Sequence, residues 1–251
     1  KKSCLILTYL TLVCFCGFRF FVGNDYAGYV KHFSLISIYE ENVIFIEPGY
    51  YALNLLFKWS PVGYFYVFFI ATALSYFFIL RQLCYERILK WGIFSLVSLG
   101  CLIWMNDIIR QGIAFSIFIY SLRYMKKGDF LSYFICVAIA CLFHYSAVVL
   151  LFFYFLRYLR LSSIVWILLI ILTFVLQYAG IFRELLKSLI AMIPYYGAYA
   201  NKADQYFVTG SVVGIGLIYK QLIAMCIALF YPKISNKFYA TLFLSGCVLD
   251  N

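Results

Sequence analysis

WMNDIIRQGIAFSIFIYSLRYMKKGDFLSYFICVAIACLFHYSAVVLLFFY, residues 104–154, is the stretch that decides the fold. It consists of two apolar segments joined by the basic turn Lys126-Lys127-Gly128-Asp129. Arg110 lies seventeen residues before Lys127, and His144 lies seventeen residues after it. If both segments are helical, the two side chains lie at a similar height, about 25 Å from the turn. In a hydrocarbon core of about 30 Å, an Arg and a His at that depth need a cavity, a partner or a ligand, which predicts a functional site.

The composition predicts an all-α, polytopic integral membrane protein. Of the 251 residues, 66% are apolar and only 12% are charged, a balance that no soluble domain of this length could bury in one core. We expect a single transmembrane domain over residues 1–251. Its ends can be incomplete, because the chain does not begin with Met and stops within an apolar run. The nine cysteines show no CxxC spacing and no His at metal-ligand spacing, so we expect no disulfide framework, no metal and no other cofactor.

The net charge of +10 is distributed in a way that indicates a membrane topology and not a nucleic-acid partner. One set of loops carries Lys1, Lys2, Arg81, Arg87, Lys90, Arg123, Lys126, Lys127, Arg157, Arg160, Lys233 and Lys237, with only Glu86 and Asp129 as acids. The other set carries eight bases and eight acids. Because excess positive charge marks the cytoplasmic side, the helix ends that carry Arg110 and His144 are expected to face outward.

The apolar runs predict nine membrane spans, one re-entrant or interfacial helix and two long outer loops. The expected spans are 3–22, 62–84, 91–105, 108–125, 130–143, 146–160, 164–180, 214–231 and 238–249. Residues 50–59 are too few to span, and residues 26–38 have the amphipathic spacing of a helix at the outer interface. The outer loops are residues 23–46 and 181–213. Very short turns separate 91–105 from 108–125 and 130–143 from 146–160, so both turns are expected to lie below the membrane surface.

The first candidate group is the polar start of the segment that contains Arg110. On a helix that begins near Asn106, four residues fall at i, i+3 and i+4 spacing and form one polar face: Asn106, Asp107, Arg110 and Gln111. One interpretation is an Asp107–Arg110 pair that neutralises itself and caps the helix. The other is that Arg110 binds an anionic ligand, because its guanidinium matches phosphate oxygens in a bidentate manner.

Other candidates lie at the predicted outer side. His144 is either a satisfied structural residue or a functional one, suited to act as a general base or as a neutral hydrogen-bond donor. His32, in the amphipathic segment, is expected to be solvated. Arg19, in the last turn of the first helix, could supply a second cation for a diphosphate, and Asp25 could supply a carboxylate that binds or deprotonates a hydroxyl. Alternatively, Arg19 only anchors the interface and Asp25 only forms a turn. Glu47 is a similar candidate, with its direction fixed by the following Pro-Gly. In the second outer loop, tyrosines including Tyr199 could stack on sugar rings or only anchor the interface.

The order of these motifs resembles a known family. FRFFVGNDYAGY, EPGYYALNLLFK, NDIIRQGIAFSIFIYSLRYMKKG and LFHYSAVVLLFFYF, within residues 15–160, are similar to the EpsG-type branch of the Wzy-like polysaccharide repeat-unit polymerases. The resemblance implies polymerisation of undecaprenyl-diphosphate-linked oligosaccharide repeat units at the outer face of a bacterial cytoplasmic membrane. It implies partners for export and chain-length control, namely a flippase and a regulator, but no metal. Arg110 and Arg19 would stabilise the leaving diphosphate, with Gln111 orienting it, and His144, Asp25 or Glu47 would be the base.

Three other functions compete with this one. A transporter or flippase of lipid-linked oligosaccharide would also place charges inside the membrane, although it predicts an inverted repeat that the sequence does not show. A glycosyltransferase or acyltransferase that adds a single unit would differ from a polymerase in the length of its product. A purely structural membrane protein would leave Arg110 and His144 replaceable.

Overall fold

The computed structural model describes residues 2–37, 46–178 and 215–249, and every regular element in these ranges is a helix. The chain forms two compact units, Lys1–Tyr154 and Phe155–Asn251. The helices of the first unit are α1 (Lys2–Gly17), α2 (Tyr26–Ser37), α3 (Pro48–Leu55), α4 (Gly63–Tyr85), α5 (Leu89–Ser98), α6 (Cys101–Asp107), α7 (Ile109–Lys127), α8 (Phe130–Cys141), η1 (Tyr145–Val149) and α9 (Leu150–Phe153). A further short helix, η2 (Tyr154–Tyr158), begins at the last residue of this unit.

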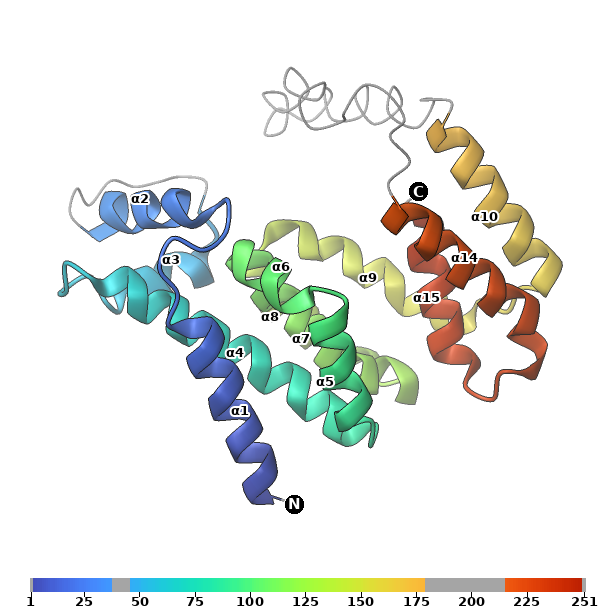
Figure 1. The fold of residues 1–251 in the computed structure, drawn as a ribbon, viewed down its shortest axis with the longest axis horizontal. Coiled ribbons are helices and arrows are strands. Elements are labelled where there is room, and N and C mark those ends of the chain that lie inside the picture. The colour runs from blue at the N-terminus through green and yellow to red at the C-terminus, as the bar shows by residue number, and fades with distance from the viewer. Residues whose placement is uncertain (1, 38–45, 179–214, 250–251) are drawn as a thin grey trace. The chain divides into compact units, whose positions relative to one another are not determined.

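The first unit is built on α4 and α7. In the order of packing, α1 lies against α4, α4 against α7, and α7 against α8 (Figure 1). The core that joins α2, α3, α4 and α7 includes Tyr50, Phe68 and Ile113, none more than 1% exposed. The basic turn between α7 and α8 forms as expected, with Gly128 in the left-handed region (φ 85°) and Asp129 accepting a 3.0 Å hydrogen bond from the Ser132 N–H.

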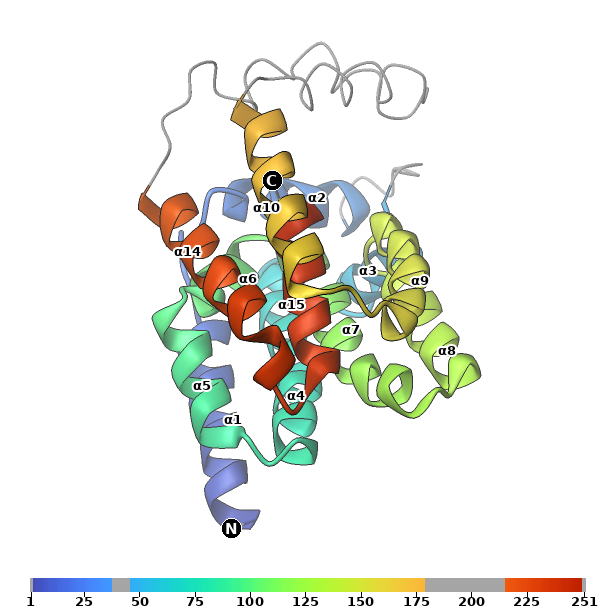
Figure 2. The same ribbon diagram turned by 90° about the vertical axis from the view of Figure 1, so that its right-hand side faces the viewer.

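The second unit contains α10 (Ser163–Tyr178), α14 (Ile215–Phe230), η3 (Tyr231–Lys233) and α15 (Lys237–Leu249). The helices α10, α14 and α15 pack on one another, and Figure 2 shows them in gold and red. Ala224 and Ala228 of α14, both fully buried, are four residues apart and therefore lie on one face of the helix. Such small residues let neighbouring helices approach closely, as is common in membrane proteins.

Three predicted helices differ from those observed. The first ends at Gly17 and not at residue 22, so Arg19 lies in the irregular segment after it; Phe21 in that segment has a positive φ of 53°. The predicted 91–105 helix is two helices, α5 and α6, bent by 66° at a break that contains Gly100 (φ 68°). The predicted 146–160 helix consists of short pieces, η1, α9 and η2. In the second case the backbone leaves helical geometry at the left-handed Gly100.

The prediction of nine spans is not confirmed. Within the described ranges, α4 is the helix that is long and apolar enough to cross a membrane, and the bent pair of α5 and α6 would be a second such span. Shorter apolar helices lie at Ser3–Gly17, Phe130–Cys141, Tyr145–Tyr158, Ser163–Leu176 and Lys237–Val248. α7 has 19 residues, but four of them are basic.

Gly17 is required by the close packing of α1 on α4. A Cβ atom at this position would lie 2.9 Å from the Phe69 ring and 3.3 Å from the Phe69 Cα, whereas a Cβ atom at Gly28 of α2 would meet nothing within 4 Å. We predict that Gly17→Ala lowers the free energy of unfolding by about 1–3 kcal/mol, because of overpacking. Gly28→Ala, the matched control, should be neutral or stabilise by about 0.5–1 kcal/mol. Thermal unfolding in detergent measures both, and an equal response of the two variants would contradict the prediction.

Candidate functional site

A single carboxylate connects the two residues that the sequence places at the same height. The Arg110 Nη1 donates to Glu47 Oε2 at 2.6 Å, and the His144 Nδ1 lies 3.3 Å from Glu47 Oε1. The Glu47 side chain is 5% exposed, while those of Arg110 and His144 are 26% and 23% exposed. Each oxygen of Glu47 therefore has its own basic partner, and both partners retain access to their surroundings. We call these three residues the Glu47 cluster.

The backbone around Glu47 fixes the direction of its side chain. Glu47 precedes Pro48, the first residue of α3, and its carbonyl accepts from the Tyr51 N–H at 2.9 Å. The Gly49 N–H donates to the Leu142 carbonyl at 2.7 Å, which ties the start of α3 to the turn that carries His144. A Cβ atom on Gly49 would lie 2.8 Å from that same carbonyl oxygen, so no side chain fits there without moving the two segments apart.

His144 occupies an extended residue (φ −156°, ψ 110°) between α8 and η1. Its N–H donates to the Ala140 carbonyl, and its own carbonyl accepts from the Ala147 N–H, both at 3.0 Å. Because Nδ1 faces an anionic oxygen of Glu47, the tautomer with the proton on Nδ1 is favoured. Nε2 has no hydrogen-bond partner within the described residues, so its lone pair remains available as a base.

Arg110 lies between aromatic rings that the sequence did not identify as part of a site. Its guanidinium carbon is 5.7 Å from the centre of the Tyr50 ring and 6.0 Å from that of Tyr29. His32 lies close to this group, since its ring centre is 6.3 Å from that of Tyr29, and its Nδ1 is buried. The expectation that His32 is solvated is therefore wrong. Tyr29 and His32 are three residues apart and therefore lie on one face of α2, and this spacing was the signal in the sequence. The sequence does not show which segments pack against that face.

The Glu47 carboxyl group has a pKa below its ordinary value. Burial raises this pKa, but the hydrogen bond with His144 and the positive charge of Arg110 outweigh burial and lower it. Glu47 therefore stays ionised over the physiological range. An ionised carboxylate with two basic partners is a poor general base, so within this cluster His144 is better suited to accept a proton.

Arg19 is the second cation of the region, and its environment differs from that of Arg110. It is only 5% exposed, and none of its three side-chain nitrogens has a hydrogen-bond partner within the described residues. Its guanidinium carbon lies 4.6 Å from the centre of the Phe68 ring. Burial lowers the pKa of Arg19, and the nearby Asp107 carboxylate opposes this shift. A buried guanidinium with this few polar contacts is suited to accept an anionic group.

The single polar face predicted for residues 106–111 is wrong. Ile108 (φ −108°, ψ 67°) leaves helical geometry, so Asn106 and Asp107 end α6, whereas Arg110 and Gln111 begin α7. Arg110 forms its ion pair with Glu47 and not with Asp107. Gln111 is exposed.

Asp107 instead holds the segment after α1. Its Oδ1 accepts from the Asp25 backbone N–H at 3.0 Å, and a Cβ atom on Gly23 (φ 97°) would lie 2.7 Å from the same oxygen. Asp25 thus takes part in this contact through its backbone N–H, and Asp25 itself is exposed. Asp107 therefore positions the loop that contains Arg19, and this is the role that the structure gives it.

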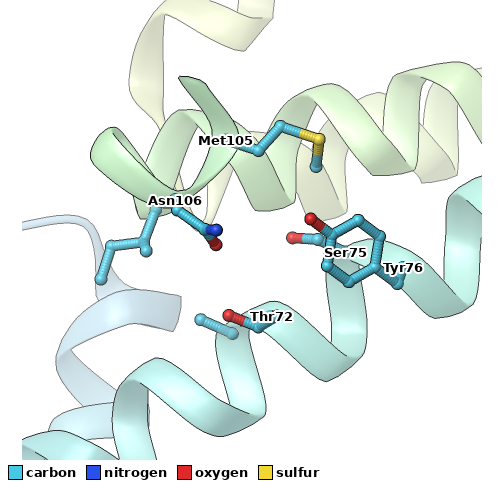
Figure 3. Close-up of a pocket in the computed structure, with 7 residues that line it drawn as sticks. Thr72, Ser75, Tyr76, Met105 and Asn106 are labelled. Carbon is cyan, nitrogen blue, oxygen red and sulfur yellow. The ribbon is translucent and has the colours of Figure 1, made fainter. Parts of the chain in front are cut away.

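Asn106 lies in a small polar pocket between α4 and α6 (Figure 3). Thr72, Ser75 and Tyr76 of α4 lie across from it, and the buried Thr72 hydroxyl has no partner in the described parts of the chain. The internal volume of about 10 Å³ is close to what one water molecule needs. The pocket is thus too small for a sugar or a phosphate as it stands.

Tyr199, the remaining candidate, lies outside the described residues. Within the described ranges, no group of three or more His, Cys, Asp or Glu side chains is arranged to hold a metal ion.

The all-helical fold and the apolar composition are consistent with a membrane protein, and the Glu47 cluster gives it a polar site. The sequence profile of the EpsG family matches residues 2–250, essentially the whole chain, and the chain belongs to this family. This confirms the resemblance seen in the sequence. Family membership indicates a polymerase-like role in polysaccharide biosynthesis. No curated protein and no solved structure matches the chain significantly.

The Gly49–Leu142 contact gives a direct test of how the Glu47 cluster is held. We predict that Gly49→Ala lowers the free energy of unfolding by about 1–3 kcal/mol, because the added methyl group meets a backbone oxygen that cannot rotate away. The ¹⁵N shifts of His144 should also change, because Glu47 moves away from Nδ1. Gly28→Ala is the control for both measurements. Unchanged stability and unchanged shifts in Gly49→Ala would show that the site does not depend on this contact.

The pKa of Glu47 predicts how stability depends on pH. A carboxyl group whose folded pKa lies below its unfolded value of 4.5 stabilises the protein above pH 4.5, and this contribution is lost as the pH falls through the folded pKa. We predict that Glu47→Gln lowers the free energy of unfolding by on the order of 2 kcal/mol at pH 7. The stability of this variant should also fall less steeply than that of the wild type as the pH decreases towards 3. Glu86→Gln removes the 2.9 Å pair between the half-buried Glu86 and the exposed Lys126, and it should lose less than Glu47→Gln because Glu86 has one such basic partner and not two. Unfolding curves between pH 3 and pH 7 measure both variants.

Proposed function

We propose that this protein polymerises lipid-linked oligosaccharide repeat units, with the Glu47 cluster as its catalytic centre. The observation that carries the proposal is the bridge from one buried carboxylate to both Arg110 and His144. It supplies a cation for a phosphate group and an oriented imidazole side by side, which is what transfer of a glycan from a diphosphate requires. Membership of the EpsG family supports the same class of reaction.

In the proposed reaction, a hydroxyl of the incoming repeat unit attacks the anomeric carbon of the growing glycan. The new glycosidic C–O bond forms while the bond between that carbon and the phosphate oxygen breaks, and undecaprenyl diphosphate leaves. His144 Nε2 takes the proton of the attacking hydroxyl. Glu47 holds the tautomer and stabilises the imidazolium that results, so it is a positioning residue and His144 is the base. Because the diphosphate is already an activated leaving group, the reaction as proposed needs no nucleotide sugar and no resident metal.

The two arginines are suited to the two negative charges of the diphosphate. Arg110 uses one Nη1 donor on Glu47 and has further N–H groups for a phosphate oxygen. Arg19, with no hydrogen-bond partner among the described residues, supplies the second cation, and Asp107 places its loop. We further propose that this side faces outward from the bacterial cytoplasmic membrane, in keeping with the distribution of positive charge. A flippase that delivers the substrate and a chain-length regulator are the proposed partners.

The decisive test is the length distribution of the glycan product. In cells that lack the native polymerase, the wild-type protein should restore a ladder of surface polysaccharide, and Arg110→Ala and His144→Ala should leave single lipid-linked repeats. In a purified assay with lipid-linked repeats, we expect losses of roughly 10²–10³-fold for Arg110→Ala and 10²–10⁴-fold for His144→Ala. Arg160→Ala, an exposed base outside the cluster, is the control for loss of charge.

His144→Asn separates the chemical role of His144 from its structural role. The Asn amide can replace Nδ1–H as a donor to Glu47 but has no counterpart of Nε2. We therefore expect a stability close to that of the wild type, with kcat as low as in His144→Ala. Membrane abundance is matched by immunoblot. Full ladders from both Arg110→Ala and His144→Ala would overturn the proposed function, and a single added unit in the wild type would indicate a transferase that does not polymerise.

A further inference from the structure

The end of the first unit where α4 and α7 finish carries a concentrated positive charge. Its bases are Arg81, Arg87, Lys90, Arg123, Lys126 and Lys127. Its two acids are already engaged: Glu86 pairs with Lys126 at 2.9 Å, and Asp129 caps the first turn of α8. Arg123 and Lys127 have no salt bridge to any described residue. This charge is therefore largely uncompensated within the unit.

Arg123 is held in place by its neighbours and not by an acid. Its guanidinium carbon lies 4.0 Å from the centre of the Tyr120 ring and 4.7 Å from that of Tyr85, and its Nε–H donates to Gln82 at 2.9 Å. Gln82 is only 3% exposed, so this contact is anchored in the core. Lys127 reaches the same Tyr85 ring, with Nζ 5.5 Å from its centre. Two cations thus meet at one half-exposed tyrosine. Arg123 Nη2 is buried without a partner among the described residues, so Nη1 is the group of Arg123 best placed to meet a ligand.

Arg87 adds an independent observation at the same end of the unit. It follows α4 with a φ of 60°, and the hydrogen bonds Arg87 N–H to Cys84 and Ile88 N–H to Leu83 form a Schellman motif. This left-handed position favours Gly, because a Cβ atom is strained there. An Arg that occupies a position suited to Gly keeps a positive charge at this end at a cost in backbone energy. Strain of this kind is a reason to examine a function for the side chain.

We propose that this end of α4 and α7 binds the phosphodiester headgroup of an anionic phospholipid, with Arg123 and Lys127 as its two cationic contacts and Arg87 at its edge. α4 has 23 residues and a length of about 34 Å, slightly more than a hydrocarbon core of about 30 Å. Its C-terminal end therefore lies at the level of the headgroups. The guanidinium matches phosphate oxygens, the Lys adds a point charge, and Tyr85 is suited to the interface.

The test uses the full-length protein in nanodiscs of phosphatidylcholine doped with phosphatidylglycerol. Native mass spectrometry measures how much phosphatidylglycerol stays bound after mild removal of the disc. We expect Arg123→Gln/Lys127→Gln to weaken this retention by about 30-fold, since each base near an anionic surface contributes roughly a fivefold factor. The matched control is Arg160→Gln/Lys237→Gln, which removes two exposed bases outside the site and should retain the lipid as the wild type does. Unfolding temperatures in neutral lipid show that each variant is folded.

Two further arms separate the possible outcomes. Lys127→Gln alone removes an exposed side chain and keeps the test valid if the double variant does not fold; it should weaken retention by about fivefold. Arg87→Gly should raise the unfolding temperature in neutral lipid and still weaken retention, a combination that a merely structural Arg would not give. Equal loss in the control pair would mean diffuse surface attraction and would overturn the proposal. Displacement of the lipid by millimolar glycerol phosphate would assign the site to a soluble phosphate and would also overturn it.

Discussion

The bridge from Glu47 to Arg110 and His144 is the interaction on which the rest of the first unit depends. An ionised carboxylate in an apolar bundle is unfavourable unless both of its oxygens are satisfied, and here each oxygen has a basic partner. The three residues come from the start of α3, the start of α7 and the turn after α8. Their pairing therefore joins three parts of the chain that are far apart in sequence, and it sets where α3 lies.

The bridge also separates the roles of groups that look equivalent in the sequence. Glu47 carries a negative charge that two neighbours stabilise, so it is better suited to orient than to accept a proton. In the part of the chain that the structure describes, His144 Nε2 has no hydrogen-bond partner, and the Arg110 guanidinium lies near the Tyr29 and Tyr50 rings with N–H groups beyond the one that Glu47 accepts. A fixed arrangement of this kind places a base and a cation without reorganisation during the reaction, which is how an enzyme gains most from electrostatics.

The two polar ends of the first unit are organised differently. At the Glu47 end, the buried carboxylate is paired with Arg110 and His144. Arg19 is buried there without a hydrogen-bond partner among the described residues, in a segment that Asp107 fastens by a hydrogen bond. At the other end of α4 and α7, bases outnumber acids, and aromatic rings and an amide hold Arg123. A buried carboxylate with two basic partners suits a site that excludes water, whereas an excess of bases at a helix end suits contact with an anionic surface.

The sequence alone determined the all-helical class of the protein, the positions of most helices and the proximity of Arg110 and His144. These follow from composition and from the constant rise of a helix, which are local properties. It did not determine that Glu47 joins these two residues, that Asn106 and Asp107 belong to the preceding helix, or that His32 lies beside the cluster. Those facts depend on where helices break and on which faces meet. Only packing between distant segments, such as Gly49 against Leu142, decides them.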